Sequence, residues 1–153
     1  MTVEEARFVG VRGCPRCHED LALLLPGRAP TGPDGEAIAL GVRVERAVVA
    51  FLEEADDVRG GMPSLVQCLL DLWRERGEVP VGFVLDRECP GLLMGTLLLR
   101  GPTGITPVRC TPGEGVLITV ALGLACMIGD GLVEDAPDVF HRIAWRGRSA
   151  SLH

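Results

Sequence analysis

Three apolar segments follow one another in the second half of the chain, at residues 79–86, 92–100 and 105–110. Only the short turns ECPG and GPTG separate them, and turns of this kind join neighbouring antiparallel strands. The middle segment, LLMGTLLLR, is apolar on both faces, which predicts a strand flanked on both sides. Gly95 within it indicates a bulge or a close backbone approach. We therefore expect a three-stranded antiparallel meander, which strongly limits the possible folds.

The rest of the chain predicts further strands and three helices. Apolar residues at i, i+3 and i+4 mark two amphipathic helices. Thr111-Pro112-Gly113-Glu114 has the T-x-x-E pattern of a capping box, with proline at the first helical position, and predicts the start of the third helix. Besides the meander, the predicted elements are strands at 6–13, 20–25, 37–41 and 125–128 and helices at 44–55, 63–76 and from residue 112. We expect an α+β domain over residues 1–136, with a mostly antiparallel sheet and three main helices, and a tail at 137–153.

Length, composition and charge limit the classes of protein to which this chain can belong. The chain has 153 residues, of which 47% are hydrophobic, and a net charge of −6. This length suits one domain with its own core, and the acidic balance argues against a broad phosphate-binding face, although not against a small basic groove. The first ten residues lack the features of a signal peptide, and the longest apolar run, Val116–Ile128, is shorter than the ~20 residues that span a bilayer. We expect a cytoplasmic protein without membrane contact.

Several segments of the chain resemble one known family. FVGVR, GVRVERAVVAFLEEA, VGFVLDRE and TPGEGVLITVALGLACMI are similar to the first strand, the Gly-x-x-Glu-Ala helix, a central strand and the closing helix and strand of the bacterial bifunctional nuclease family. The resemblance extends from about Phe8 to Ala136. It implies a bifunctional-nuclease-like fold, and members of that family are described as cutting both DNA and RNA.

The chain departs from this family where the family carries its polar motifs. Met62, Pro63 and Ser64 stand in place of Thr-His-Asp, and residues 110–114 (CTPGE) stand in place of Ala-Arg-Pro-Ser-Asp. Glu45 matches the glutamate of the family's first helix. Cutting a phosphodiester requires stabilisation of an anionic transition state by metal-bound carboxylates, Arg or His. The replacements supply little of that chemistry.

These departures favour a protein that binds an apolar small molecule in a hydrophobic pocket and transforms it, for example by cyclising a biosynthetic intermediate. Such a reaction can be accelerated mainly by restricting the conformation of the substrate. The candidate catalytic residues are Glu114, Glu45 and Arg109. The candidate substrate-binding residues are Met62, Ser64, Trp73, Phe83, Met94, Cys110 and Thr111. Apolar strands and helices that we expect to be exposed predict a homo-oligomer.

Two alternative functions stay open. A nuclease would use Glu45, Glu114 and Arg109 around a divalent metal, with nucleic acid as its partner; without that activity we expect no cofactor. A binding or assembly module would be non-catalytic. Both acids also have structural explanations, because Glu114 completes the capping box and Glu45 meets the positive end of a helix dipole.

Cys14-Pro15-Arg16-Cys17-His18 has the C-x-x-C-H spacing of c-type haem attachment. That chemistry belongs to an oxidising export compartment, which the N-terminal sequence does not indicate. A zinc site formed by Cys14, Cys17, His18 and one distant ligand is the alternative, although no second C-x-x-C supplies a closed set of four ligands. We expect an exposed hairpin turn whose thiols bind no metal.

Overall fold

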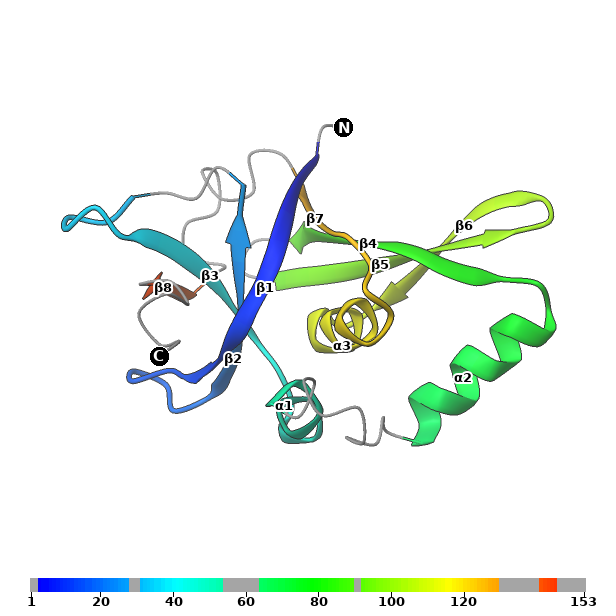
Figure 1. Cartoon of the computed structure of the whole chain (residues 1–153), viewed down its shortest axis with the longest axis horizontal. Coiled ribbons are helices and arrows are strands. Elements are labelled where there is room, and N and C mark those ends of the chain that lie inside the picture. Colours follow the sequence, from blue (N-terminus) through cyan, green and yellow to red (C-terminus); the bar gives the residue numbers. More distant parts are fainter. Residues whose placement is uncertain (1–2, 28–30, 54–63, 90–91, 130–140, 146–153) are drawn as a thin grey trace.

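The computed structural model describes residues 3–27, 31–53, 64–89, 92–129 and 141–145. In these residues, three helices pack against a sheet of eight strands (Figure 1). The elements in chain order are β1 (Val3–Gly13), β2 (Asp20–Pro26), β3 (Ala37–Arg43), α1 (Arg46–Glu53), α2 (Ser64–Glu75), β4 (Val79–Cys89), β5 (Leu92–Gly101), β6 (Gly104–Cys110), α3 (Pro112–Leu122), β7 (Cys126–Gly129) and β8 (His141–Trp145).

The sheet has the strand order β6-β5-β4-β7-β1-β2-β3-β8. Every neighbouring pair is antiparallel except β4 and β7, which run parallel. The sheet therefore consists of two antiparallel groups that meet at this parallel pair. The expected α+β architecture with a mostly antiparallel sheet and three helices is confirmed, as is the meander, in which β5 pairs with β4 on one side and β6 on the other.

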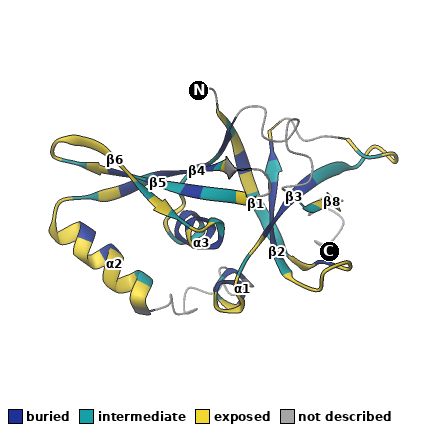
Figure 2. Ribbon diagram, turned by 180° about the vertical axis from the view of Figure 1, so that it is seen from behind, coloured by how far each residue is buried: buried dark blue, intermediate teal, exposed yellow. Residues whose placement is uncertain are grey.

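Helices α1 and α3 lie on the same side of the sheet, and α3 contacts β3, β4 and β5 (Figures 1 and 2). The main core lies between these helices and the sheet, and Phe83 of β4 is completely buried in it. Gly95 of β5 and Gly115 of α3 both lie against the Phe83 ring. Of the two expectations for Gly95, the close approach is confirmed.

A second apolar cluster lies around β1, β2 and β3, apart from the main core. Its buried residues are Cys14, Leu21, Leu23 and Ala39, and Ile143 and Trp145 of β8 pack against them. Strand β8 pairs with β3 at the edge of the sheet. This differs from the expected tail at 137–153, because His141–Trp145 belong to the folded sheet. A five-residue strand with three consecutive apolar residues, Ile143 to Trp145, is too short to give a clear alternating pattern.

Helix α2 buries one side only. Leu70 and Trp73 are buried, whereas Leu65, Leu69 and Leu72 are exposed, with Leu65 at 83% of its full accessible surface. Figure 2 shows most of α2 as exposed. Leu65, Leu69, Leu72 and Trp73 follow a helical spacing that places them near one face of α2, yet they are divided between the core and the surface. Within the described part of the chain, none of the helices has both the length and the apolar character needed to span a membrane.

Candidate functional site

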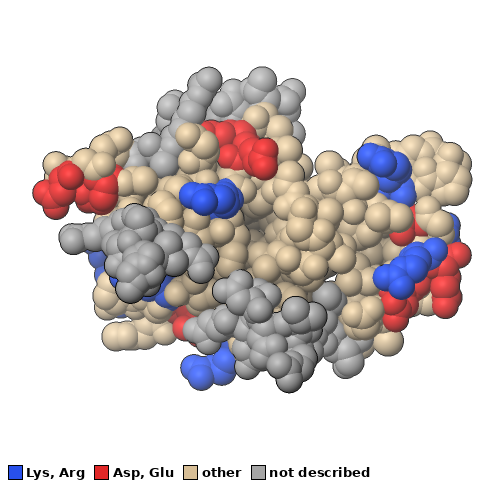
Figure 3. Space-filling model, viewed as in Figure 1, with Lys and Arg blue, Asp and Glu red and all other residues tan. Residues whose placement is uncertain are grey.

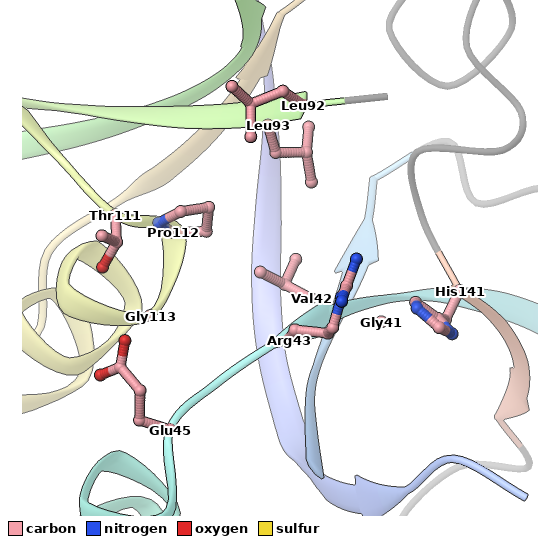
Figure 4. Close-up of a pocket in the computed structure, with 10 residues that line it drawn as sticks. All are labelled: Gly41, Val42, Arg43, Glu45, Leu92, Leu93, Thr111, Pro112, Gly113 and His141. Atoms are coloured by element: carbon pink, nitrogen blue, oxygen red, sulfur yellow. The ribbon is translucent and has the colours of Figure 1, made fainter. Parts of the chain in front are cut away.

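A cleft of about 250 Å³ opens where the N-terminus of α3 approaches β3 and the start of β5 (Figure 4). Its apolar surface comes from Val42 of β3, Leu92 and Leu93 of β5, and Pro112 of α3. Its polar surface comes from Arg43, Glu45, Thr111 and His141, and glycines 41 and 113 complete the lining. The cleft therefore combines an aliphatic wall with polar groups in nearly equal measure, and such polar groups can fix the orientation of a ligand.

The α3 end of the cleft is fixed by the predicted capping box. The Thr111 hydroxyl accepts a hydrogen bond from the Glu114 backbone N–H at 3.2 Å, and a Glu114 carboxylate oxygen accepts one from the Thr111 N–H at 2.8 Å. Pro112 occupies the first turn, where its missing N–H costs no helical hydrogen bond. Since Glu114 already accepts a hydrogen bond from a backbone donor, its carboxylate has a structural role, and Glu114 itself does not line the cleft.

Replacing Thr111 with alanine is expected to lower the free energy of unfolding by about 1 kcal/mol, within the range of 0.5–2 kcal/mol seen for lost N-caps. Glu114→Gln keeps an acceptor for the Thr111 N–H and should cost less than Glu114→Ala. Urea unfolding of the three variants measures both effects. If Glu114→Gln proves as destabilising as Glu114→Ala, the hydrogen bond of the capping box is not what Glu114 contributes.

Glu45 lies at the bottom of the cleft in Figure 4, where its carboxylate points towards the start of α3, and Arg43 lies beside Val42 at the end of β3. The Glu45 carbonyl accepts hydrogen bonds from the N–H groups of Val48 and Val49, so Glu45 stands immediately before α1, which begins two residues later than the helix predicted at 44–55. The Arg43 guanidinium forms an exposed salt bridge with Glu19 at 3.2 Å. Both side chains are exposed, so a ligand in the cleft could reach them.

The structure brings only part of the predicted site together. Glu45 and Thr111 line the cleft. Phe83 and Trp73 are buried in the main core instead, so they pack the fold and do not line this cleft. Met62 lies outside the described residues.

The remaining predicted residues occupy other positions around β5 and β6. Met94 is half-buried on β5, and Arg109 is exposed on β6 opposite Thr96. Cys110 is half-buried at the end of β6; its burial, and to a lesser degree the charge of Glu114, raises the pKa of its thiol to about 11. Ser64 is the first residue of α2.

Sequence reasoning missed most of the cleft lining. Leu92 and Leu93 belong to a segment whose sequence predicts an ordinary strand. Val42 and Arg43 are the last residues of a different strand, β3. Pro112 and Gly113 lie inside the capping motif, which was the one signal in the sequence that pointed to this part of the cleft. His141 was assigned to the tail, and only the pairing of β8 with β3 brings it to the cleft.

A second group of reactive side chains lies beside the cleft. Cys14 and Cys17 come from the turn between β1 and β2, and His141 comes from the start of β8; their thiol and imidazole atoms all lie within 4.8 Å of one another. The distance from Cys14 Sγ to His141 Nδ1 is 3.5 Å. His18, the histidine expected to join the two cysteines, is exposed in a left-handed conformation with φ of 61° and is not part of this group.

The two thiols differ in their surroundings. The backbone N–H of Cys17, followed by that of Arg16, lowers the pKa of the Cys14 thiol to about 6. For Cys17, the N–H of Glu19 acts in the same direction, but burial and the neighbouring Cys14 outweigh it and raise the pKa of this thiol. Cys14 is 4% exposed and Cys17 is exposed, so the turn is not wholly at the surface as the sequence analysis expects. Of the residues that the structure describes, these three are the set that could hold a metal ion.

A scan against protein-family models finds no match to this chain, and a search of curated proteins finds none that is significantly similar. The likeness to the bifunctional nuclease family therefore rests on the sequence segments quoted above.

Proposed function

We propose that this chain has a divergent bifunctional-nuclease-like fold that binds a small, largely apolar molecule in the cleft at the start of α3 and transforms it, for example by cyclisation. The observation that carries this proposal is the cleft itself, where an aliphatic wall faces a few polar side chains. Two of the residues singled out from the sequence, Glu45 and Thr111, contribute to it.

The size of the cleft supports a small ligand. Its volume of about 250 Å³ lies just below the range of ~300–1,000 Å³ that is common for small-molecule pockets. Leu92 is 46% exposed beside the cleft, and burying its apolar surface under a ligand would be favourable by about 25 cal/mol for each Å² removed from water. An apolar ligand body would therefore lie against Leu92 and Leu93.

The polar groups would orient the ligand. Arg43 offers a planar cation that can donate two hydrogen bonds to a carboxylate or a similar oxygen pair. Glu45 and Thr111 offer acceptors, and the Thr111 hydroxyl is also a donor. Holding both ends of a flexible molecule brings its reacting atoms together, and orientation alone can supply several kcal/mol of a cyclisation barrier.

The charge distribution supports this assignment over the nuclease alternative. On the face shown in Figure 3, arginine side chains of the described residues form separate groups, and uncharged surface lies between the groups near the middle and those at the right. Nucleic-acid binding depends on a continuous set of cations along the phosphates. In addition, Glu114, which a nuclease site would need, is held in the capping box.

A cleft-blocking variant tests the proposal. A panel of small amphipathic acids and alcohols is screened for a rise in the melting temperature of the wild type. Leu92→Trp fills the cleft from an exposed position and should abolish the rise caused by each hit. Ile105→Trp is the matched control, because Ile105 is 53% exposed in the same sheet and does not line the cleft. The proposal fails if no compound stabilises the protein, or if the hits stabilise Leu92→Trp as much as the wild type.

The expected homo-oligomer stays a prediction. The surface best suited to it is the exposed leucine row of α2, formed by Leu65, Leu69 and Leu72. Their i, i+4 and i+7 spacing places them on one side of the helix, as in helices that pack against a partner.

A further inference from the structure

The two cysteines of the C-P-x-C turn and a histidine from the other end of the chain lie close together beside the cleft. Cys14 and His141 are 127 residues apart in sequence, yet their Sγ and Nδ1 atoms are 3.5 Å apart. The exposed Cys17 thiol lies within 4.8 Å of both. Three side chains with metal-binding atoms thus converge from two separate elements.

The turn that carries the cysteines is tightly held by its own backbone. The Cys14 N–H donates to the Glu19 carbonyl at 2.8 Å, and the His18 N–H donates to the Cys14 carbonyl at 2.9 Å. The N–H groups of Arg16 and Cys17 point at the Cys14 sulfur. Backbone donors directed at a sulfur favour a thiolate, which is the form that binds a metal. The turn is therefore pre-organised as a pair of ligands.

The position of His141 depends on a glycine in the neighbouring strand. His141 is paired with Gly41 of β3. A Cβ atom at residue 41 would lie 3.1 Å from the His141 Cβ and 2.8 Å from a Leu21 methyl group. Because Gly41 has no side chain, His141 can pack closely over β3 and reach the cysteines.

We propose that Cys14, Cys17 and His141 bind a zinc ion that joins the β1–β2 turn to strand β8. In tetrahedral coordination, with Zn–S of about 2.3 Å and Zn–N of about 2.0–2.1 Å, a sulfur and a nitrogen ligand lie about 3.6 Å apart. The separation of 3.5 Å between Cys14 Sγ and His141 Nδ1 agrees with this value. Two thiolates and one imidazole suit zinc better than magnesium or calcium, which prefer oxygen ligands. Solvent takes the fourth position.

A redox-active dithiol is the competing explanation for a C-x-x-C turn, and the geometry favours it less. In a dithiol oxidoreductase the cysteine that attacks the substrate must be accessible. Here Cys17 is exposed, but Cys14 is only 4% exposed. A dithiol also gives no role to His141, which the zinc site uses as its third ligand.

The proposed zinc site does not rest on the proposed small-molecule function, although the two sites share His141. His141 lines the cleft as well, so a bound ion would stiffen one side of it. The ion would chiefly hold β8, which among the described strands has one hydrogen-bonded neighbour, β3, and lies at the edge of the sheet. Loss of the metal should therefore loosen β8 and leave the distant core at Phe83 unchanged.

Metal analysis of the full chain tests the proposal directly. The protein is purified under reducing conditions from zinc-supplemented cells, and zinc per chain is measured by plasma mass spectrometry. Cobalt is then exchanged for zinc, and thiolate-to-cobalt charge-transfer absorption is recorded. We expect one zinc per wild-type chain and cobalt–thiolate absorption. Cys17→Ser and His141→Ala should each weaken zinc binding more than about 100-fold, since even second-shell changes cost 10–100-fold.

Two matched variants separate the site from its surroundings. Cys68→Ser removes an exposed thiol on α2, and His18→Asn changes the histidine next to Cys17 to a residue that tolerates the left-handed conformation. Both should keep full zinc content.

If the reduced wild type binds no zinc, if it is isolated only as a Cys14–Cys17 disulfide, or if Cys17→Ser retains the metal, the proposal is wrong. Should His141→Ala fail to fold, treatment of the wild type with a chelator replaces it: faster amide exchange in β8 supports the site, and unchanged exchange overturns it.

Discussion

Replacing Phe83 with alanine is expected to lower the free energy of unfolding by about 3–5 kcal/mol, the largest effect of any substitution considered for this chain. Phe83 is completely buried in β4. Its ring lies between two backbones, at Gly95 of β5 and Gly115 of α3. Helix and strands cannot close over the resulting space without moving the whole of α3, so a cavity would remain. Urea or thermal unfolding measures the loss.

Gly115→Ala tests the same contact from the other side. A Cβ atom at residue 115 would collide with three atoms of the Phe83 ring, and one at residue 95 would lie 2.5 Å from the ring. We expect Gly115→Ala to cost about 1–3 kcal/mol or more through overpacking. In the Phe83→Ala background the added methyl group enters the cavity, so the double variant should be more stable than the sum of the single effects predicts.

Gly82→Ala is the control for this pair. Residue 82 is buried next to Phe83, but an added Cβ would meet only a Leu98 methyl group at 3.7 Å, an ordinary contact distance. Its stability should therefore change by less than that of Gly115→Ala. Additive effects of Phe83→Ala and Gly115→Ala would show that the ring and the helix backbone do not share this contact.

Gly41→Ala is expected to release strand β8 from the sheet and to cost about 1–3 kcal/mol. The new methyl group would lie 2.8 Å from Leu21, which is fully buried and has no free space to enter, and 3.0 Å from the His141 carbonyl oxygen. The strand at the edge is the part most easily displaced. Hydrogen exchange of the β8 amides, Arg142 to Trp145, should become much faster than in the wild type.

The effect of Gly41→Ala should stay local. Strands β4 and β5, at the other end of the sheet, contribute to the main core. Hydrogen exchange of their amides should become faster only by the amount that the overall loss of stability causes. Unchanged exchange in β8 would mean that Leu21 or the backbone adjusts to the methyl group. In that case Gly41 would not set the distance between β3 and His141.

Most elements of the fold could be predicted from the sequence because their signals are local. Turn residues mark the ends of the strands in the meander. Four residues, Thr111 to Glu114, predict both the start of α3 and its capping box. The parallel pairing of β4 with β7 was not predictable, because it joins segments separated by β5, β6 and α3. Strand β8 was missed for a related reason: its stability comes from packing of Ile143 and Trp145 on a distant cluster.

The candidate site was harder to predict than the fold. Glu45 and Thr111 were found through motif positions, whereas Leu92 and Leu93 carry no local signal that separates a cleft wall from a core strand. Large apolar residues did not identify the ligand-binding surface correctly, since Phe83 is buried in the core. The metal-binding group depended on long-range pairing: the sequence offers His18 beside Cys17, but the fold brings His141.

The central claim is that a small molecule binds at the start of α3, and amide-resolved NMR titration tests it most directly. The compound from the panel that stabilises the wild type most is added to ¹⁵N-labelled protein. We predict that the largest shift changes fall on Val42, Arg43, Leu93 and Gly113, which line the cleft, and that Leu92→Trp removes them. Changes that centre instead on the exposed leucines of α2, or that persist in Leu92→Trp, would contradict the claim.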